Sequence, residues 1–511
     1  MEVSAYLASS HQFFSSELFH RVQMAGLFAD SKTFADAKPK SDITLILNAY
    51  KEQLPADNES LLAFVNMHFV IPTPPQEPEV QSEDLQAYIT RLWPALTRKG
   101  VTQTAGSLLP LPCDYLVPGG RFREIYYWDS FFTSLGLMRS GYEAQVQSMV
   151  DNFISLQQSV GLIPNGSRTY YSSRSQPPVL ALMISLLEKN GVEAGPEDLN
   201  GYYLQALIRE HHFWMNGADE ITGSGAIQRA VKLPDGELLN RYWDDSATPR
   251  PESYREDMEL AQGLSESDAQ VFYRNIRAAC ESGWDFSSRW LADPESLLSI
   301  QTTDLIPVDL NCLLVILEQT IARLSAHVHG EDDEQKQYWQ QKAQARTDAI
   351  NKYCWREDMG AFVDFNHQQM QPSSVHALST VLPLFAGIAN SEQADKVAQA
   401  LQTQFLQKGG LLTSVNQTTQ QWDAPNGWAP LQWFAVEALK AYGKTELAEE
   451  IANRWLETVN NYYQCHHTLM EKYNVVNTTA SAKGGEYEVQ HGFGWTNGVV
   501  QAFFAMQKAT Q

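Results

Sequence analysis

The sequence has few cysteines, and they are not arranged as disulfide or zinc motifs. Only five occur among 511 residues, an odd number, and none forms a C-x-x-C pair. This pattern excludes a disulfide framework and a zinc knuckle as organising features. We therefore predict reduced, buried thiols at Cys113, Cys280, Cys312, Cys354 and Cys465.

Positive charge is also scarce. Lys and Arg number 37 against 60 Asp and Glu, so the formal net charge is −23 at pH 7. Nucleic acids and anionic membranes are bound mainly by an excess of Lys and Arg on one face. The charge balance therefore argues against both partners, and the acidic surface is expected to favour solubility.

Long apolar runs are missing as well. No run reaches the roughly 18 apolar residues of a membrane span, and Met1–Ala8 lacks the basic start and apolar stretch of a secretory signal. We expect a cytoplasmic monomer. A periplasmic protein whose mature chain was restarted at Met1 would look the same, so the periplasm stays open as an alternative.

Alternating strand patterns are few, and helical periodicity dominates instead. Pro430 begins one predicted helix that ends near Gly443, and Thr445 is expected to cap the next, so the short link between them predicts an antiparallel hairpin. A third helix follows Pro307, with apolar residues at spacings of three and four: Leu310, Leu314, Leu317, Ile321 and Leu324.

Short links alternate with long loops from about residue 128 to the C-terminus. This alternation predicts a closed ring of helical hairpins whose long loops converge on one mouth. We expect residues 1–58 to form an N-terminal arm packed on the ring and residues 59–511 to form the ring itself. Within the arm, Asp30–Lys40 is expected to be irregular. Beyond the arm, Ile71–Pro78 is expected to be an extended, proline-rich linker.

Six of the long loops share one composition, in which aromatic rings are mixed with arginines, amides and carboxylates. They span residues 118–129, 163–178, 240–253, 281–290, 421–430 and 471–495. Any one of them is explained by ordinary loop packing, with an arginine stacked on a ring or a carboxylate capping a turn. Six together favour one shared pocket for a neutral, hydroxyl-rich ligand.

Such a pocket suits a sugar. Aromatic rings pack against the C–H face of a pyranose, and charged groups bind its hydroxyls. Cleavage of a glycosidic bond needs one protonated and one ionised carboxyl group. Asp285 is an attractive acid because Trp284 and Phe286 would desolvate it. On these grounds its partner stays open among Asp129, Asp244, Asp245, Glu252, Glu471 and Glu486.

The loops also resemble the motifs of a known enzyme family. Pro118–Asp129 is similar to the first signature of the trehalases of glycoside hydrolase family 37, and Gln421–Pro430 resembles the second. Shorter segments match the same family in the same order: Pro164–Gly166, Arg174–Pro178, Arg250–Ser253, Ser282–Asp285 and Gly492–Gly498. The resemblance covers most of the chain, from about residue 15.

This resemblance implies an all-α fold, an (α/α)6 barrel, and hydrolysis of α,α-trehalose to two glucose molecules with inversion and without cofactor or metal. It implies Asp285 as general acid and Glu471 as general base, with carboxyl groups roughly 6.5–9.5 Å apart. Gly283 would let the backbone approach the sugar. The implied substrate-binding residues are Arg121, Phe122, Trp128, Asp129, Asn165, Arg174, Arg250, Glu252, Gly283, Trp422 and Glu486.

Two other functions stay open on the sequence alone. One is another (α/α)6 carbohydrate enzyme, such as a phosphorolytic disaccharide enzyme, and the other is a non-catalytic sugar-binding protein. The loop at residues 481–491 departs from the family in having fewer glycines before Glu486. If this loop covers the site, we expect a stiffer lid and altered turnover, which replacement of Lys483 by Gly would test.

Overall fold

The computed structural model describes residues 3–73, 83–102, 105–192, 199–330, 334–482 and 484–510. Most of the predicted linker Ile71–Pro78, and Lys483 in the predicted lid, lie outside these ranges. The α-helices are α1 Val3–Phe14, α2 Glu17–Met24, α3 Ser31–Ala35, α4 Ile43–Gln53, α5 Asn58–His68, α6 Leu85–Leu96, α7 Tyr127–Leu137, α8 Glu143–Val160, α9 Leu180–Lys189, α10 Leu199–Trp214, α11 Tyr254–Leu260, α12 Glu266–Ser282, α13 Val308–His329, α14 Glu334–Cys354, α15 Leu382–Phe385, α16 Ser391–Ala400, α17 Ala429–Ala441, α18 Thr445–His466 and α19 Gly494–Thr510.

The strands are short and pair into small antiparallel sheets, as the scarcity of alternating patterns predicts. They are β1 Lys38–Pro39, β2 Phe69–Val70, β3 Thr97–Arg98, β4 Tyr115–Leu116, β5 Gly225–Ile227, β6 Ala230–Lys232, β7 Leu238–Asn240, β8 Leu305–Ile306, β9 Trp355–Arg356, β10 Ala361–Phe362, β11 Phe365–Asn366, β12 Gln371–Pro372, β13 Leu406–Gln407, β14 Gly410–Leu411, β15 Asn426–Trp428 and β16 Lys472–Asn474. The pair that bears on the site is β15 with β16, in which Trp428 lies opposite Lys472.

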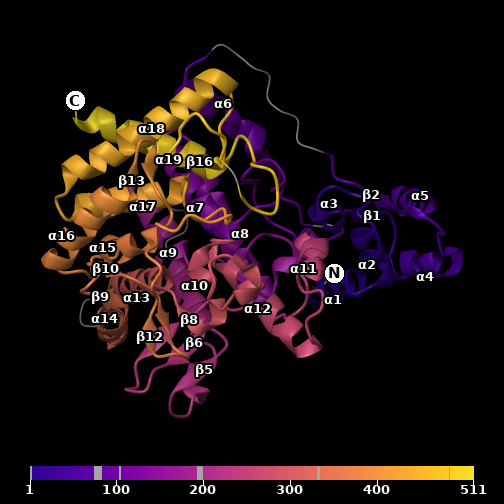
Figure 1. Cartoon of the computed structure of the whole chain (residues 1–511), viewed down its shortest axis with the longest axis horizontal. Helices are drawn as coiled ribbons and strands as arrows, with labels where there is room; N and C mark the ends of the chain where they lie inside the picture. Colours follow the sequence, from indigo (N-terminus) through magenta and orange to yellow (C-terminus); the bar gives the residue numbers. More distant parts are fainter. Residues whose placement is uncertain are drawn as a thin grey trace.

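Six helices form a closed inner ring. α7 packs on α9, α9 on α13, α13 on α15, α15 on α17, α17 on α19, and α19 returns to α7. Outer helices cover this ring, with α8 on α7 and α9, α10 on α13, α14 on α13, and α18 on α17 and α19. Figure 1 shows these helices gathered into one body. Alternation of inner and outer helices is the architecture of an (α/α)6 barrel, so the predicted fold is confirmed.

The predicted helices lie close to their expected bounds. α13 follows Pro307, and its apolar stripe is buried in the core of the ring. Pro430 lies in the first turn of α17, as expected. The expected cap on α18 is wrong: Thr445 is its first residue, Lys444 occupies the N-cap position, and no side chain caps the helix.

The first five helices lie to one side of the barrel (Figure 1), and we propose that they make up the N-terminal arm. Its core is an aromatic cluster that includes Phe13, Phe19 and Phe34 and continues into Phe64 and Phe69, beyond the predicted boundary at residue 58. The antiparallel pair β1–β2 joins Lys38–Pro39 to Phe69–Val70, across that boundary. We therefore propose that the arm ends after β2.

Two further predictions need correction. Asp30–Lys40 is not irregular, because Asp30 caps α3 with its side chain and β1 follows. The thiols are all free, but only three are buried: Cys113 is half-buried and Cys465, near the end of α18, is exposed. In the described part of the chain, no helix is long and apolar enough to cross a membrane.

Candidate active site

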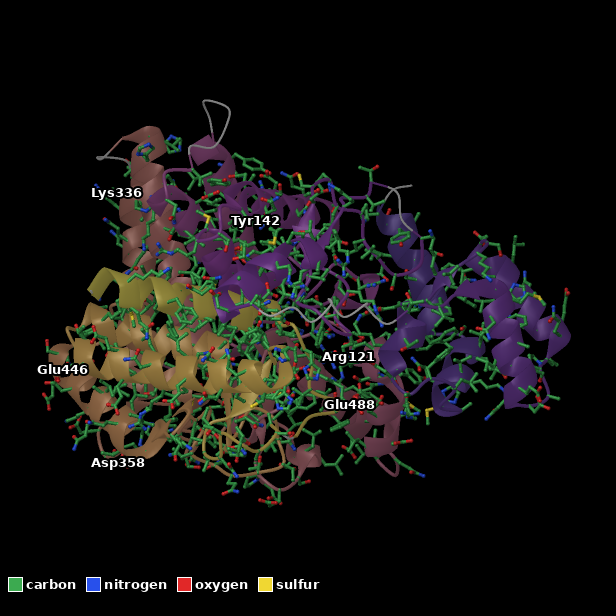
Figure 2. All side chains as sticks on the ribbon, turned by 90° about the horizontal axis from the view of Figure 1, so that it is seen from above. Arg121, Tyr142, Lys336, Asp358, Glu446 and Glu488 are labelled. Atoms are coloured by element: carbon green, nitrogen blue, oxygen red, sulfur yellow. The ribbon has the colours of Figure 1, made fainter. Side chains whose placement is uncertain are left out.

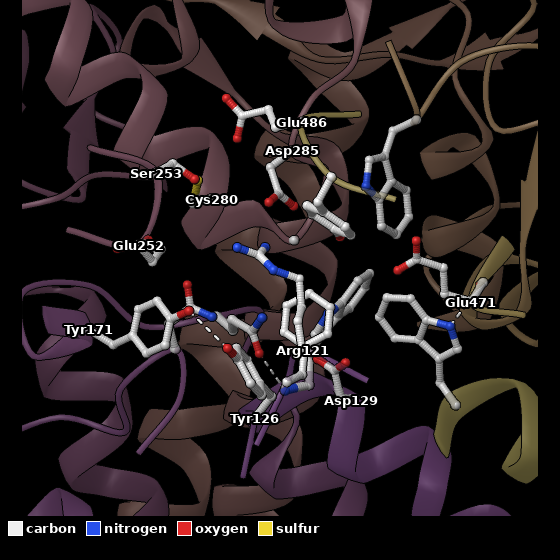
Figure 3. A pocket seen from close by; sticks show the side chains of 18 of the residues that line it. Arg121, Tyr126, Asp129, Tyr171, Glu252, Ser253, Cys280, Asp285, Glu471 and Glu486 are labelled. Atoms are coloured by element: carbon white, nitrogen blue, oxygen red, sulfur yellow. Dashed lines mark hydrogen bonds between the residues drawn. The ribbon is translucent and has the colours of Figure 1, made fainter. Parts of the chain in front are cut away.

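One cavity is lined by all thirteen residues that the sequence nominated as catalytic or substrate-binding. They come from segments between Arg121 and Glu486 that meet only in the folded chain. Figure 3 shows the carboxyl groups of Asp285 and Glu471 pointing into this cavity, with Asp129 below them and Glu252 and Glu486 at other parts of its wall. Proximity is thus established for the whole set, while the role of each residue stays a prediction.

The cavity lies at the N-terminal ends of several inner helices. Asp129 is in the first turn of α7, Gln176 stands shortly before α9, Trp428 is the N-cap residue of α17, and Trp495 is in the first turn of α19. Backbone N–H groups at helix N-termini carry partial positive charge. This orientation favours a site rich in carboxylates and hydroxyl oxygens.

Asp285 is positioned by the end of α12. Gly283 closes that helix in the left-handed conformation, with φ of 76°. A Cβ at Gly283 would lie 2.7 Å from Cε2 of Trp128, so the missing side chain makes room for this ring. Gln421 donates a hydrogen bond from Nε2 to the backbone oxygen of Asp285 at 2.5 Å. Burial raises the pKa of Asp285 to about 7, with an opposing effect from the Arg250 cation and a further rise from Glu486.

Glu471 stands immediately before β16 and is held by the segment that leads into α19. Its backbone N–H donates to the oxygen of Gln490 at 3.1 Å, and its Oε1 accepts from the N–H of Gln490 at 3.3 Å. Its Oε2 is buried without a hydrogen-bond partner among the described residues. Burial raises the pKa of Glu471 to about 7, against the lowering effect of the neighbouring Lys472 cation.

Asp129 is a third buried carboxyl in the same cavity. Burial raises its pKa to about 8, and the nearby negative charges of Asp285 and Glu471 contribute to the rise. A carboxyl group with this pKa is largely protonated at neutral pH and can donate a hydrogen bond. The prediction of Asp129 as a hydroxyl-binding residue fits that state.

Two arginines are fixed by carboxylates around the cavity. Arg174 donates from Nη2 to Glu252 at 2.7 Å and from Nε to Asn165 at 3.0 Å. Arg250 donates from Nη2 to Glu486 at 2.9 Å. Burial by itself would raise the pKa of Glu252, but the cations of Arg174, Arg250 and Arg277 bring it below its usual value. Glu252 therefore stays ionised.

Aromatic rings form one wall. Trp422 stacks on Trp428 with ring centroids 3.9 Å apart, and its centroid lies 5.9 Å from that of Trp128. Phe122 meets Tyr487 and Phe493 edge to face. These contacts hold each ring in one orientation, which suits the flat face of a sugar.

The cavity is also lined by nine residues that the sequence did not nominate: Tyr126, Tyr171, Gln176, Ser253, Cys280, Trp428, Tyr487, Phe493 and Trp495. Most of them stand in the six loops, so composition could have included them. Cys280 lies inside α12 and carries no such signal. Of the open candidates, Asp244 is buried against Arg174 and Arg277, Asp245 is exposed, and neither lines the cavity.

Comparison with known proteins agrees with the family resemblance seen in the sequence. The profile of the Trehalase family matches residues 26–507. The structure of neutral trehalase from Saccharomyces cerevisiae is similar to this one with a TM-score of 0.65, at 24% identity over 83% of this chain and 80% of that one. A mannosylglycerate hydrolase from Thermus thermophilus is similar with a TM-score of 0.54, at 18% identity over 82% of this chain and all of that one. The two structures support the fold, and the match to the family profile over most of the chain shows that this protein belongs to the trehalase family of glycoside hydrolases.

Proposed function

We propose that the cavity hydrolyses α,α-trehalose to two glucose molecules with inversion at one anomeric carbon. The observation that carries this proposal is the pair of buried carboxyl groups, Asp285 and Glu471, which line one cavity and have pKa values raised to about 7. A pair of carboxyl groups with pKa values near neutrality can supply one acid and one base.

In the proposed reaction, protonated Asp285 donates its proton to the glycosidic oxygen as the bond from that oxygen to the anomeric carbon breaks. Ionised Glu471 takes a proton from a water molecule that attacks this carbon from the opposite face. Its Oε2, which has no partner among the described residues, is the oxygen left for that water. The attacked sugar then leaves as β-glucose and the other as α-glucose.

The remaining groups would bind the substrate. Arg121, Arg174 and Arg250 donate to sugar hydroxyls, and ionised Glu252 accepts from them. Trp128 and the other rings of the aromatic wall pack against the pyranose faces. Because the positions of these groups are set before substrate arrives, they can stabilise the transition state without reorganisation.

Substitution of the two carboxyl groups tests the proposal. Asp285→Asn and Glu471→Gln should each lower kcat by about 10²–10⁴-fold, while the exposed Asp245→Asn should leave it unchanged. Anomer-resolved NMR of the fresh product from trehalose should show β-glucose and α-glucose in equal amounts. Maltose and sucrose serve as comparison substrates. Full activity in either carboxyl variant would refute the assignment.

The same experiment separates the alternatives. Glucose release that requires added phosphate would indicate a phosphorolytic enzyme, and tight trehalose binding without turnover would indicate a binding protein. The intact pair of carboxyl groups argues against the latter. If Asp129→Asn lowers kcat as much as is expected of Asp285→Asn, and Asp285→Asn does not, then Asp129 is the general acid.

The pH dependence follows from the two pKa values. Glu471 loses its function as a base when the pH falls below its pKa of about 7. Asp285 loses the proton that it must donate when the pH rises above its pKa of about 7. We therefore expect kcat/KM to form a narrow bell centred near neutrality, measured with trehalose well below KM. A profile that stays flat to pH 9 would contradict the role of Asp285.

We propose in addition that the protein is a cytoplasmic monomer without a nucleic-acid partner. Five free cysteines suit a reducing compartment, and the net charge of −23 opposes binding to nucleic acid. Sedimentation equilibrium would test the monomer, cell fractionation the compartment, and a gel-shift assay with DNA and RNA the lack of a nucleic-acid partner.

A further inference from the structure

An ion pair joins the N-terminal arm directly to a residue that lines the cavity. Arg121, a cavity residue of the barrel, donates from Nε and from Nη2 to the two carboxylate oxygens of Asp30, both at 2.7 Å. Asp30 itself does not line the cavity. Figure 2 shows Arg121 on the side of the barrel that faces the arm.

Asp30 is held in place from within the arm. Its Oδ1 also accepts from the backbone N–H of Lys32 at 2.9 Å, which caps the first turn of α3. The neighbouring Ser31 donates to Glu256 at 2.7 Å, and Gln23 donates to the backbone oxygen of Pro251 at 3.2 Å. The arm thus packs on the segment that carries Arg250 and Glu252 as well as on Arg121.

Arg121 is held on its remaining sides by the cavity. Its guanidinium carbon lies 4.5 Å from the ring centroid of Tyr487, and its backbone N–H donates to Oε1 of Gln490 at 2.7 Å. Its Nη1 donates no hydrogen bond within the described ranges. The bidentate contact with Asp30 fixes the plane of the guanidinium, so that the third nitrogen is available to a ligand.

We propose that Asp30 is a positioning residue of the active site, and that the arm is therefore a functional part of that site. The proposal rests on the proposed function, in which Arg121 binds a sugar hydroxyl. An arginine side chain has several rotatable bonds, and a carboxylate that grips two of its nitrogens reduces the freedom lost when the sugar binds. The Arg121 cation also lowers the pKa of Glu471, so that its placement affects the base as well.

A matched pair of variants separates this role from helix capping. Asp30→Asn keeps an acceptor for the N–H of Lys32 but cannot accept two hydrogen bonds from Arg121. Asp42→Asn alters an equivalent cap in the same arm, where Asp42 accepts from the N–H of Thr44 at 2.8 Å. We expect Asp30→Asn to lower kcat/KM for trehalose by about 10–100-fold, while both variants share the same Tm and Asp42→Asn keeps full activity.

A double-mutant cycle with Arg121→Ala shows whether Asp30 acts through this arginine. In the Arg121→Ala background, Asp30→Asn should cause no further loss, because its partner is already absent. Asp30→Glu should recover part of the activity, since it restores the charge and both oxygens. Equal losses in the two backgrounds, or full activity of Asp30→Asn, would overturn the proposal.

The Kd for trehalose should also be measured for each variant of the cycle, from the fluorescence of the tryptophans in the cavity. If the unaltered protein releases no glucose from trehalose, the proposed function fails, and the Kd values still report on Asp30. If Asp30→Asn changes neither the Kd nor kcat/KM, the role of Asp30 is rejected while the proposed function stands.

Discussion

Lys472 follows Glu471 in the chain and is fully buried beside it. Its Nζ lies 3.9 Å from Oε1 of Glu471 and donates to Oε1 of Gln421 at 2.6 Å and to the backbone oxygen of Gly484 at 2.9 Å. Gln421 in turn contacts the backbone of Asp285. One buried cation is thus connected to the proposed base, the proposed acid and the loop before Glu486.

Removal of this cation should shift the pH profile. Lys472→Met keeps the size of the side chain and removes the charge that lowers the pKa of Glu471. We expect the acidic limb of the kcat/KM profile to move to higher pH by about one unit. Lys440→Met, which alters an exposed lysine paired with Glu437, is the control and should leave the profile unchanged. An unaltered acidic limb in Lys472→Met would show that the charge does not act on the base.

Residue composition was informative about the site because the chemistry of sugar binding requires unusual loop residues. Arg174 and Trp422 are costly in an ordinary loop, since a buried arginine needs partners and a tryptophan needs a packed surface. As candidate partners of Asp285, Glu252 and Asp244 were equivalent on residue chemistry, and the family resemblance alone singled out Glu252 as substrate-binding. Only the fold shows that one lines the cavity while the other neutralises arginines behind it.

At the scale of elements, a close contact of two backbones in the inner ring joins α7 and α19. Gly498 lies in α19, and a Cβ there would be 1.9 Å from the backbone oxygen of Phe132 in α7. A Cβ at Gly136 would in turn be 2.8 Å from the Cα of Gly498. The two backbones therefore approach each other where only glycine fits, and this contact closes the ring.

Gly498→Ala should separate these two helices. We expect a loss of about 3 kcal/mol in the free energy of unfolding, because a methyl group has no space between two backbones. The KM for trehalose should also rise, since α7 and α19 carry Asp129 and Trp495 at their first turns. Thermal and urea unfolding would measure the loss.

The control is Gly443→Ala, at a glycine with φ of 71° and no atom within 4 Å of a built Cβ. Strain of the left-handed conformation alone should cost about 1–2 kcal/mol there and leave KM unchanged. Equal effects of the two substitutions would mean that helix contact is not what makes Gly498 necessary.

Helical periodicity predicted several helices of the ring but not their neighbours in space. Spacings of three and four identified α13 and α17, because the pattern of buried residues along a helix is a local property of the chain. Glu124, in the first signature segment Pro118–Asp129, lies outside the cavity and pairs with Arg168 and Lys32.

At the scale of the whole molecule, this pairing joins the arm to the barrel. Glu124 is fully buried, and its carboxylate accepts from Arg168 at 2.9 Å and lies 2.8 Å from the ammonium of Lys32. Asp36 of the arm contacts the same two cations. Tyr126, which lines the cavity, donates to Glu124. The aromatic cluster of the arm includes this tyrosine, so the two parts share a core.

Glu124→Gln should therefore lower the stability of arm and barrel together. Two buried cations would lose part of their compensating charge, with an expected cost of about 3–5 kcal/mol. Because arm and barrel share this network, we expect one calorimetric transition at a lower Tm. Glu188→Gln, which alters an exposed pair with Arg323, should change stability by less than about 1 kcal/mol. A separate early transition for the arm would contradict the shared core.

The sequence alone determined the class of fold, the six loops of the site and the family, because periodicity, loop composition and motifs are properties of neighbouring residues. The tertiary structure alone decided which of those residues act on one another. Asp30 and Arg121 are 91 positions apart, and nothing in either segment indicates the other. The approach of Gly498 to α7 is equally invisible in sequence. Such pairs depend on how distant segments meet, which only the packed chain specifies.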